Sequence, residues 1–191
     1  MTTVTTQPEH TPPEGYEDVS IPLTKIVREA TVLSIVMLIV PLLIYILIHG
    51  WEAFWSTAFE YDLLVALVAF AALIVIHELI HAVGWKLFGN LRWQDLTFGI
   101  DRKTLSPYCH AKVPMRANAY RIGAALPGIL TGIVPAIISL VQVNAPLMLL
   151  SAVMISAAVG DLLVLWVIRD VPGNALVKDH PSNAGCYVKR A

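Results

Sequence analysis

Charged residues are scarce in this chain. Only 14% of its 191 residues are Asp, Glu, Lys or Arg, whereas 57% are hydrophobic. Ordinary soluble domains are about one-quarter charged, so the composition indicates a membrane protein whose first partner is the lipid bilayer. A net charge of -1 and the absence of a basic cluster also exclude nucleic acid as a partner.

Cysteine is equally sparse. The two cysteines, Cys109 and Cys186, form no C-x-x-C pair. This spacing excludes a disulfide framework. We expect both residues to be free thiols on the reducing side of a membrane.

Long apolar runs dominate what is present. Four of them are long enough to cross the roughly 30 Å of hydrocarbon in a bilayer. They cover residues 26–48, 63–85, 119–143 and 147–168. We therefore predict an all-α membrane protein in which residues 23–170 form a domain of four transmembrane helices. Residues 1–22 and 171–191 are polar, and we expect a flexible N-terminal tail and a C-terminal tail there.

A polar connection separates the second and third runs. Its apolar and polar residues alternate on both sides of Asp101, which predicts a short β-hairpin over residues 91–114. Basic residues are abundant in residues 86–121 and in the C-terminal tail, and the 49–62 and 144–146 connections have none. Since positive residues stay on the cytoplasmic side, the hairpin and both termini should face the cytoplasm, with a cell membrane as the default location.

The second run contains His77-Glu78-Leu79-Ile80-His81. Residues i and i+4 share one face of a helix, so His77 and His81 can hold one zinc ion while Glu78 lies beside it as a general base. Ionisable side chains are costly within a bilayer unless they have partners, which strengthens this interpretation against a chance match.

A catalytic zinc site needs a third protein ligand. No glutamate follows Glu78, and Leu87 stands where another common motif has its third histidine. The remaining candidates are Asp95, Asp101, Asp161, Asp170, Asp179, His110 and His180. Asp161 is the one inside an apolar run, and its distance from the run's end matches that of the two histidines. We therefore expect His77, His81 and Asp161 to bind one Zn²⁺.

These features resemble a family of membrane proteins known as "putative zincin peptidase". The resemblance covers about residues 70–190, through the His77–His81 motif, Ala125-Leu126-Pro127, Gly160-Asp161 and the Val177–Pro181 segment. The chain is more distantly similar to site-2-type intramembrane metalloproteases, although Leu162 stands where those have a glycine after the aspartate. The resemblance implies zinc-dependent hydrolysis of a peptide bond in a membrane or membrane-proximal protein.

Three residues are candidates for oxyanion or substrate binding, namely His110, Tyr108 and Asn118. Two other functions remain open for the chain. It could relay or transport ions through its intramembrane His, Glu and Asp residues, or it could be a catalytically silent scaffold. The sequence also leaves open whether the chain forms an oligomer.

Overall fold

The computed structural model describes residues 11–100 and 107–190 of the chain. Four helical stretches in this part are long and apolar enough to cross a membrane. They cover Thr24–His49, Leu63–Gly89, Ala117–Gln142 and Ala145–Val167. These stretches coincide with the four predicted spans to within a few residues. Many of their large apolar side chains face outward, as lipid-facing side chains do.

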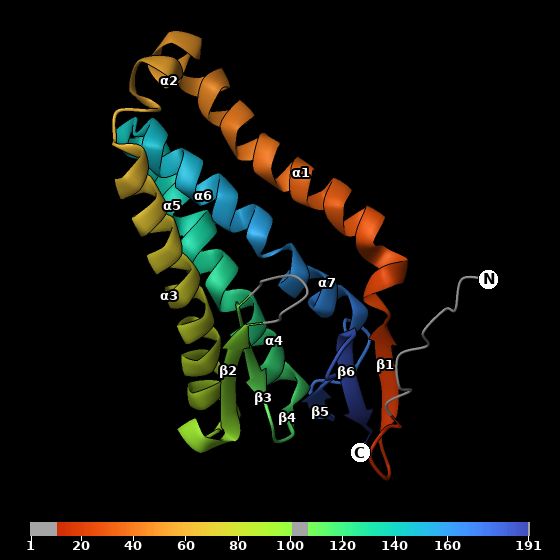
Figure 1. Cartoon of the computed structure of the whole chain (residues 1–191). Helices are drawn as coiled ribbons and strands as arrows, with labels where there is room; N and C mark the ends of the chain where they lie inside the picture. The colour runs from red at the N-terminus through yellow and green to blue at the C-terminus, as the bar shows by residue number, and fades with distance from the viewer. Residues whose placement is uncertain (1–10, 101–106, 191) are drawn as a thin grey trace, which may run out of the picture.

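The first two spans are long helices joined at one end of the molecule (Figure 1). They and the short helix between them are α1 (Leu23–His49), α2 (Trp51–Thr57) and α3 (Leu63–Gly89). Gly50 separates α1 from α2 with a φ of 91°, a conformation that favours glycine. The side chain of Asp62 caps α3 by accepting from Leu64 N at 2.7 Å, which satisfies one of the free N–H groups of the first turn.

The third span changes its helical pitch in the middle. It consists of α4 (Ala117–Pro127), a π-helical turn (Gly128–Ile133) and α5 (Val134–Gln142). Pro127 cannot donate a backbone hydrogen bond, and such positions disturb the regular helical ladder. Short π-helical turns are frequent at functional sites, and this one carries the buried residue Thr131.

The fourth span is also interrupted. Its two parts are α6 (Ala145–Ala157) and α7 (Val159–Val167), and the side chain of Asn144 caps the first by accepting from Leu147 N. The break at Ala158 comes three residues before Asp161. Asp161 therefore lies in the first turn of a new helix, not in the middle of a continuous one.

Strands add a second layer at one end of the molecule. A four-stranded antiparallel sheet has the order β1-β6-β5-β4, and its members are β1 (Glu17–Ile21), β4 (Met115–Arg116), β5 (Leu176–Asp179) and β6 (Ala184–Lys189). The prediction of an all-α fold is therefore incomplete. The parts described within the two expected tails, 1–22 and 171–191, supply three of these strands, because pairing buries apolar residues such as Val177 and Val188.

The two-stranded sheet lies within the segment predicted as a hairpin. β2 (Leu96–Ile100) pairs antiparallel with β3 (Pro107–Ala111), and Leu96 faces Ala111 in this register. A short 3-10 turn (Trp93–Asp95) precedes β2. The connecting residues 101–106, with the candidate ligand Asp101, lie outside the described part of the chain.

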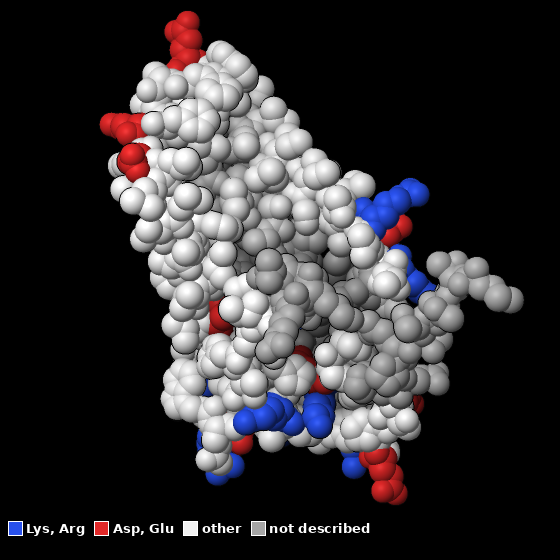
Figure 2. Space-filling view, in the orientation of Figure 1, with Lys and Arg blue, Asp and Glu red and all other residues white. Residues whose placement is uncertain are grey.

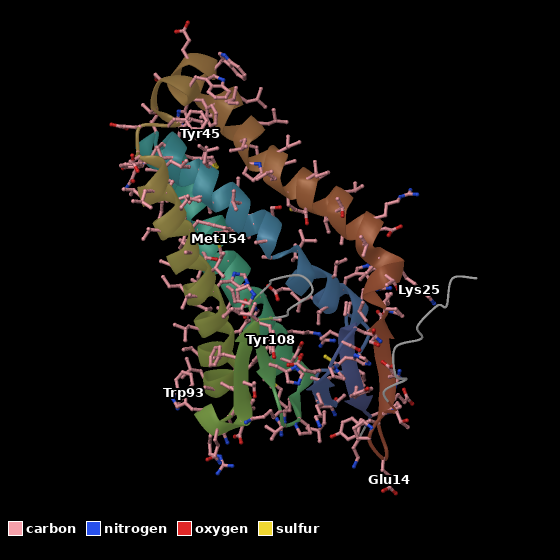
Figure 3. The ribbon with its side chains drawn as sticks, in the orientation of Figure 1. Glu14, Lys25, Tyr45, Trp93, Tyr108 and Met154 are labelled. Atoms are coloured by element: carbon pink, nitrogen blue, oxygen red, sulfur yellow. The ribbon has the colours of Figure 1, made fainter. Side chains whose placement is uncertain are left out.

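Basic groups are unevenly distributed over the molecule. In the view of Figure 2 the end with α2 shows acidic groups without basic ones, whereas the basic groups lie toward the end with the sheets, among further acidic groups. A cluster around Tyr45 and Phe54 packs the α2 end, and a larger one around Trp85, Tyr120 and Val177 joins the helices to the four-stranded sheet. The two clusters share no residue. Tyr45, in the first of them, lies near the α2 end of the molecule (Figure 3).

Candidate metal centre

α3 presents two buried histidines on one face. His77 and His81 are 7% and 5% exposed, and their ring centroids lie 5.1 Å apart. Their spacing of four residues brings them together because one helical turn has 3.6 residues. The structure thus places both residues of the motif as the sequence predicts.

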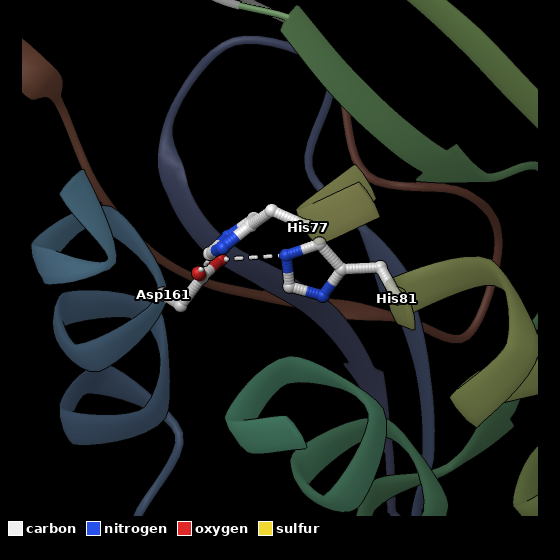
Figure 4. A group of neighbouring side chains, drawn as sticks. All are labelled: His77, His81 and Asp161. Carbon is white, nitrogen blue, oxygen red and sulfur yellow. Dashed lines mark hydrogen bonds and ion pairs between the residues drawn. The ribbon is translucent and has the colours of Figure 1, made fainter. Parts of the chain in front are cut away.

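Asp161 completes the group from α7 (Figure 4). Its Oδ2 lies 3.1 Å from His77 Nε2, and its Oδ1 lies 3.3 Å from His81 Nε2. One ligand atom from each of the three residues can be chosen so that all lie within 4.8 Å of one another. Residues far apart in the sequence therefore form a compact set of two nitrogens and a carboxylate, a ligand set typical of catalytic zinc.

The hydrogen bonds on the far side of each ring bear on whether a cation fits there. His81 Nδ1 lies 3.0 Å from the Gly123 carbonyl oxygen, which can only accept, so Nδ1 carries the proton. Thr131 lies 3.4 Å from His77 Nδ1 and donates its own proton to Pro127 O. In neutral rings both Nε2 atoms then face the carboxylate as acceptors. Acceptors that face one another need a cation, and a histidine whose other nitrogen is held in this way is the usual metal ligand.

A cavity of about 870 Å³ opens beside this group. Glu78, His81 and Asp161 line it together with residues of β3, α4 and the β5–β6 connection. The Glu78 carboxyl lies within hydrogen-bonding reach of the Cys109 backbone N–H on β3. The carboxylate that would act as a general base therefore faces the same space as two of the candidate ligands.

Close helix packing holds α3 against α4. A Cβ atom at Gly84 would lie 2.9 Å from Gly123 Cα, so the two backbones meet where a larger residue does not fit. The Trp85 ring stacks between His81 and Tyr120, and its Nε1 donates to Tyr120 O at 3.2 Å. These contacts fix the rotation of α3, and with it the direction of His81.

Two of the three predicted substrate residues reach the cavity. His110 and Tyr108 line it from β3. Asn118 does not line it. Asn118 instead lies against Gly173 and accepts from Arg121 Nη1 at 3.3 Å, so it helps to join α4 to the segment after α7.

The other acidic candidates for the third ligand have separate surroundings. Asp95 accepts hydrogen bonds from the backbone N–H and the side chain of Arg92, which lower the pKa of this carboxyl, and Asp170 is exposed beside Arg169. Asp179 is buried, and its Oδ2 lies 3.4 Å from His110 Nδ1. Burial raises the pKa of Asp179, and the charge of His110 acts against that rise. None of these three belongs to the group formed by His77, His81 and Asp161.

Sequence reasoning missed the partners that orient the ligands. Thr131 is one of many hydroxyl residues in apolar helices, so its sequence context does not single it out. The Gly123 contact uses a backbone carbonyl, which every residue has, so the sequence cannot indicate it. A proline and two glycines, Pro127, Gly128 and Gly132, flank this position in the sequence. Such helix-disturbing residues are the one local signal for an irregular turn here.

Comparison with known proteins agrees with this geometry. Residues 70–176, more than half of the chain, match a family model described as "Putative zincin peptidase". The chain belongs to this family. The matched region contains the His77–His81 motif and Asp161. No curated protein and no solved structure matches the chain.

Proposed function

We propose that this member of the zincin family is a membrane-embedded, zinc-dependent metallopeptidase that cleaves a membrane or membrane-proximal protein. The observation that carries the proposal is the convergence of His77, His81 and Asp161 beside the cavity that Glu78 lines. An ion relay needs a chain of titratable groups across the bilayer. Here His77, His81 and Asp161 form one compact cluster instead.

The ligand residues fit one zinc ion, with the Nε2 atoms of His77 and His81 and a carboxylate oxygen of Asp161 as donors. When bound, zinc supplies Lewis-acid activation of a water molecule and of the scissile carbonyl. Glu78 accepts a proton from the attacking water and passes it to the nitrogen of the leaving amine. The bond formed is carbon–oxygen, the bond broken is carbon–nitrogen, and Glu78 ends in its starting state.

The cavity wall supports the choice of a peptide as substrate. β3 borders the cavity and has a single strand partner, β2, among the described residues. An extended peptide can add to such an edge through main-chain hydrogen bonds. This mode would place a carbonyl of the peptide near Glu78, since the carboxyl already lies against the backbone of β3.

The charge distribution supports an orientation. The basic residues gather at the end of the molecule that holds the sheets and the cavity (Figure 2). By the positive-inside rule this end, with both termini, faces the cytoplasm of a cell membrane. The substrate would then enter the cavity from the cytoplasmic side or from the adjacent leaflet.

The proposal is tested by zinc content and by hydrolysis in detergent-purified protein. We expect one zinc per chain in wild type and loss of zinc in His77→Ala and Asp161→Ala. Glu78→Gln should keep zinc but lose hydrolysis of fluorescent casein, because its amide cannot accept the water proton. Wild-type protein that folds without zinc in chelator-free buffer would refute the proposal.

Matched control variants separate ligand loss from general damage. His49→Ala removes a helical histidine at the α2 end, where His49 Nε2 bonds to Leu140 O, and Asp170→Ala removes an exposed carboxylate. Both should retain zinc and hydrolysis. If Glu78→Gln keeps hydrolysis while zinc binds normally, the general-base role is wrong. If zinc binds and no hydrolysis occurs in wild type, the scaffold alternative gains support.

A further inference from the structure

The cavity has a second polar wall that the metal centre does not use. β5 and its connection to β6 supply it, and the lining residues there are Asp179, His180, Ser182 and Asn183. These residues lie beyond the segment matched by the family model. They come from the region predicted as a C-terminal tail.

Asp179 is the buried charge of this wall. It is 7% exposed, and its Oδ2 accepts from Ala111 N at 2.8 Å and lies 3.4 Å from His110 Nδ1. The Tyr120 hydroxyl also bonds to it. Among the described residues, His110 is the one basic side chain within ion-pair distance of Asp179.

Asp179 Oδ2 faces Nδ1 of His110 at an ion-pair distance of 3.4 Å. No hydrogen bond to another described residue engages Nε2. The side chain of His110 is 30% exposed and lines the cavity with Glu78 and Asp161. The preceding residue, Cys109, carries the backbone N–H beside Glu78. Consecutive residues of β3 therefore approach the general base and the carboxylate–imidazole pair.

We propose that the β5–β6 hairpin completes the catalytic cavity and that Asp179 is a positioning residue. Asp179 orients the ring of His110 so that its Nε2–H donates to the oxyanion of the tetrahedral intermediate. This inference rests on the proposed function. It predicts selective recognition of a tetrahedral anion in the cavity, because a pre-oriented donor acts mainly on charge that develops during the reaction.

The test uses two zinc-directed probes built on the same peptide. A peptidyl phosphonamidate presents a tetrahedral anion, whereas a peptidyl hydroxamate is planar at the zinc-binding group. We expect Asp179→Asn and His110→Gln in the zinc-loaded full chain each to weaken phosphonamidate binding by at least about 10-fold, the loss expected for a hydrogen bond to a charged group. Hydroxamate binding should stay within about 2-fold. The double variant should be no weaker than either single one, because both remove the same interaction.

The outcomes separate this inference from the proposed function. Equal weakening of both probes, or no weakening of either, overturns the role of Asp179 and His110 while the metallopeptidase proposal stands. Failure of wild type to bind zinc or either probe overturns both. If Asp179→Asn does not fold, His110→Gln still decides the matter, because it leaves the buried carboxylate with its Ala111 and Tyr120 partners.

A metal-free measurement checks the geometry independently. In ¹⁵N-histidine-labelled protein, His110 should show a hydrogen-bonded Nδ1–H signal that His110→Gln assigns and Asp179→Asn abolishes. A His110 ring without that signal in wild type would overturn the positioning role, whatever the protein hydrolyses.

Discussion

Asp161 divides its carboxylate between two histidines of another helix. Its Oδ2 faces His77 and its Oδ1 faces His81, at 3.1 and 3.3 Å. Because the far nitrogen of each ring already has an acceptor, the near nitrogens of the neutral rings meet the carboxylate as further acceptors. A bound cation resolves this conflict, and two changes, at Asp161 and at Thr131, test it.

Replacement of Asp161 by asparagine should remove most of the zinc affinity. The amide keeps the size of the side chain but loses its charge. We expect an affinity loss greater than about 100-fold, which is the upper end of what loss of an outer partner costs. Competition with a fluorescent zinc chelator measures it. Asp170→Asn, at an exposed carboxylate, serves as the control, and equal affinity in the two variants would contradict a ligand role for Asp161.

Thr131→Val should weaken zinc binding without unfolding the protein. Valine matches threonine in shape but cannot accept from His77 Nδ1, so the tautomer and direction of that ring are no longer fixed. Removal of such an outer partner costs about 10- to 100-fold in affinity. Thr57→Val is a suitable control, because Thr57 makes the same kind of bond to the carbonyl four residues earlier, remote from the site. Unchanged affinity in Thr131→Val would show that the 3.4 Å contact does not orient the ring.

Part of this centre could be predicted from the sequence and part could not. The i, i+4 spacing is a property of one helix, so it identified His77, Glu78 and His81 without tertiary information. Asp161 could be found because an aspartate in an apolar run needs a partner. Its depth in the membrane also follows from the number of residues between it and the end of its span. Thr131 and Gly123 depend on how α4 and the π-helical turn rotate against α3, which no local pattern encodes.

The strands also divide into those that a local sequence pattern predicts and those that depend on tertiary pairing. The β2–β3 pair was predictable because its alternating residues are neighbours in the sequence. β1 and β6 lie at opposite ends of the described chain, and short polar segments resemble tails until pairing buries one face. Val177, Cys186 and Val188, each fully buried, were the apolar positions that could have indicated strands in the C-terminal segment.

Gly123→Ala should destabilise the fold around the site. Its Cβ would overlap the indole of Trp85, which is stacked between His81 and Tyr120 and cannot move freely. Overpacking of this kind costs about 1–3 kcal/mol. Gly160→Ala is the matched control, since a Cβ there meets nothing within 4 Å. Thermal unfolding in detergent compares the two, and equal melting temperatures would contradict the close contact of α3 with α4.

Cys109 should be slow to alkylate although it lines the cavity. Burial, with added repulsion from the charges of Glu78 and Asp179, raises the pKa of its thiol to about 12. The reactive thiolate at pH 8 is then roughly a thousandfold scarcer than in a free cysteine. Iodoacetamide labelling followed by mass spectrometry should show a rate that keeps rising with pH beyond 10. Denatured protein should label rapidly at pH 8, and an equally fast rate in the folded protein would contradict the raised pKa.

The N-terminal strand should contribute to stability. All five residues of β1 pair with β6, and β1 leads directly into α1, so it ties the first span to the sheet beside the cavity. A chain that begins at Tyr16 keeps this strand, whereas one that begins at Leu23 loses it and leaves an edge of β6 unpaired. We expect the shorter chain to melt at least about 3 °C lower, the shift that 1 kcal/mol produces in a protein of this size. Its first span should also be cut sooner by protease added from the sheet side. Equal melting and equal protection in the two truncated chains would mean that β1 adds no stability and behaves as the tail that its composition suggests.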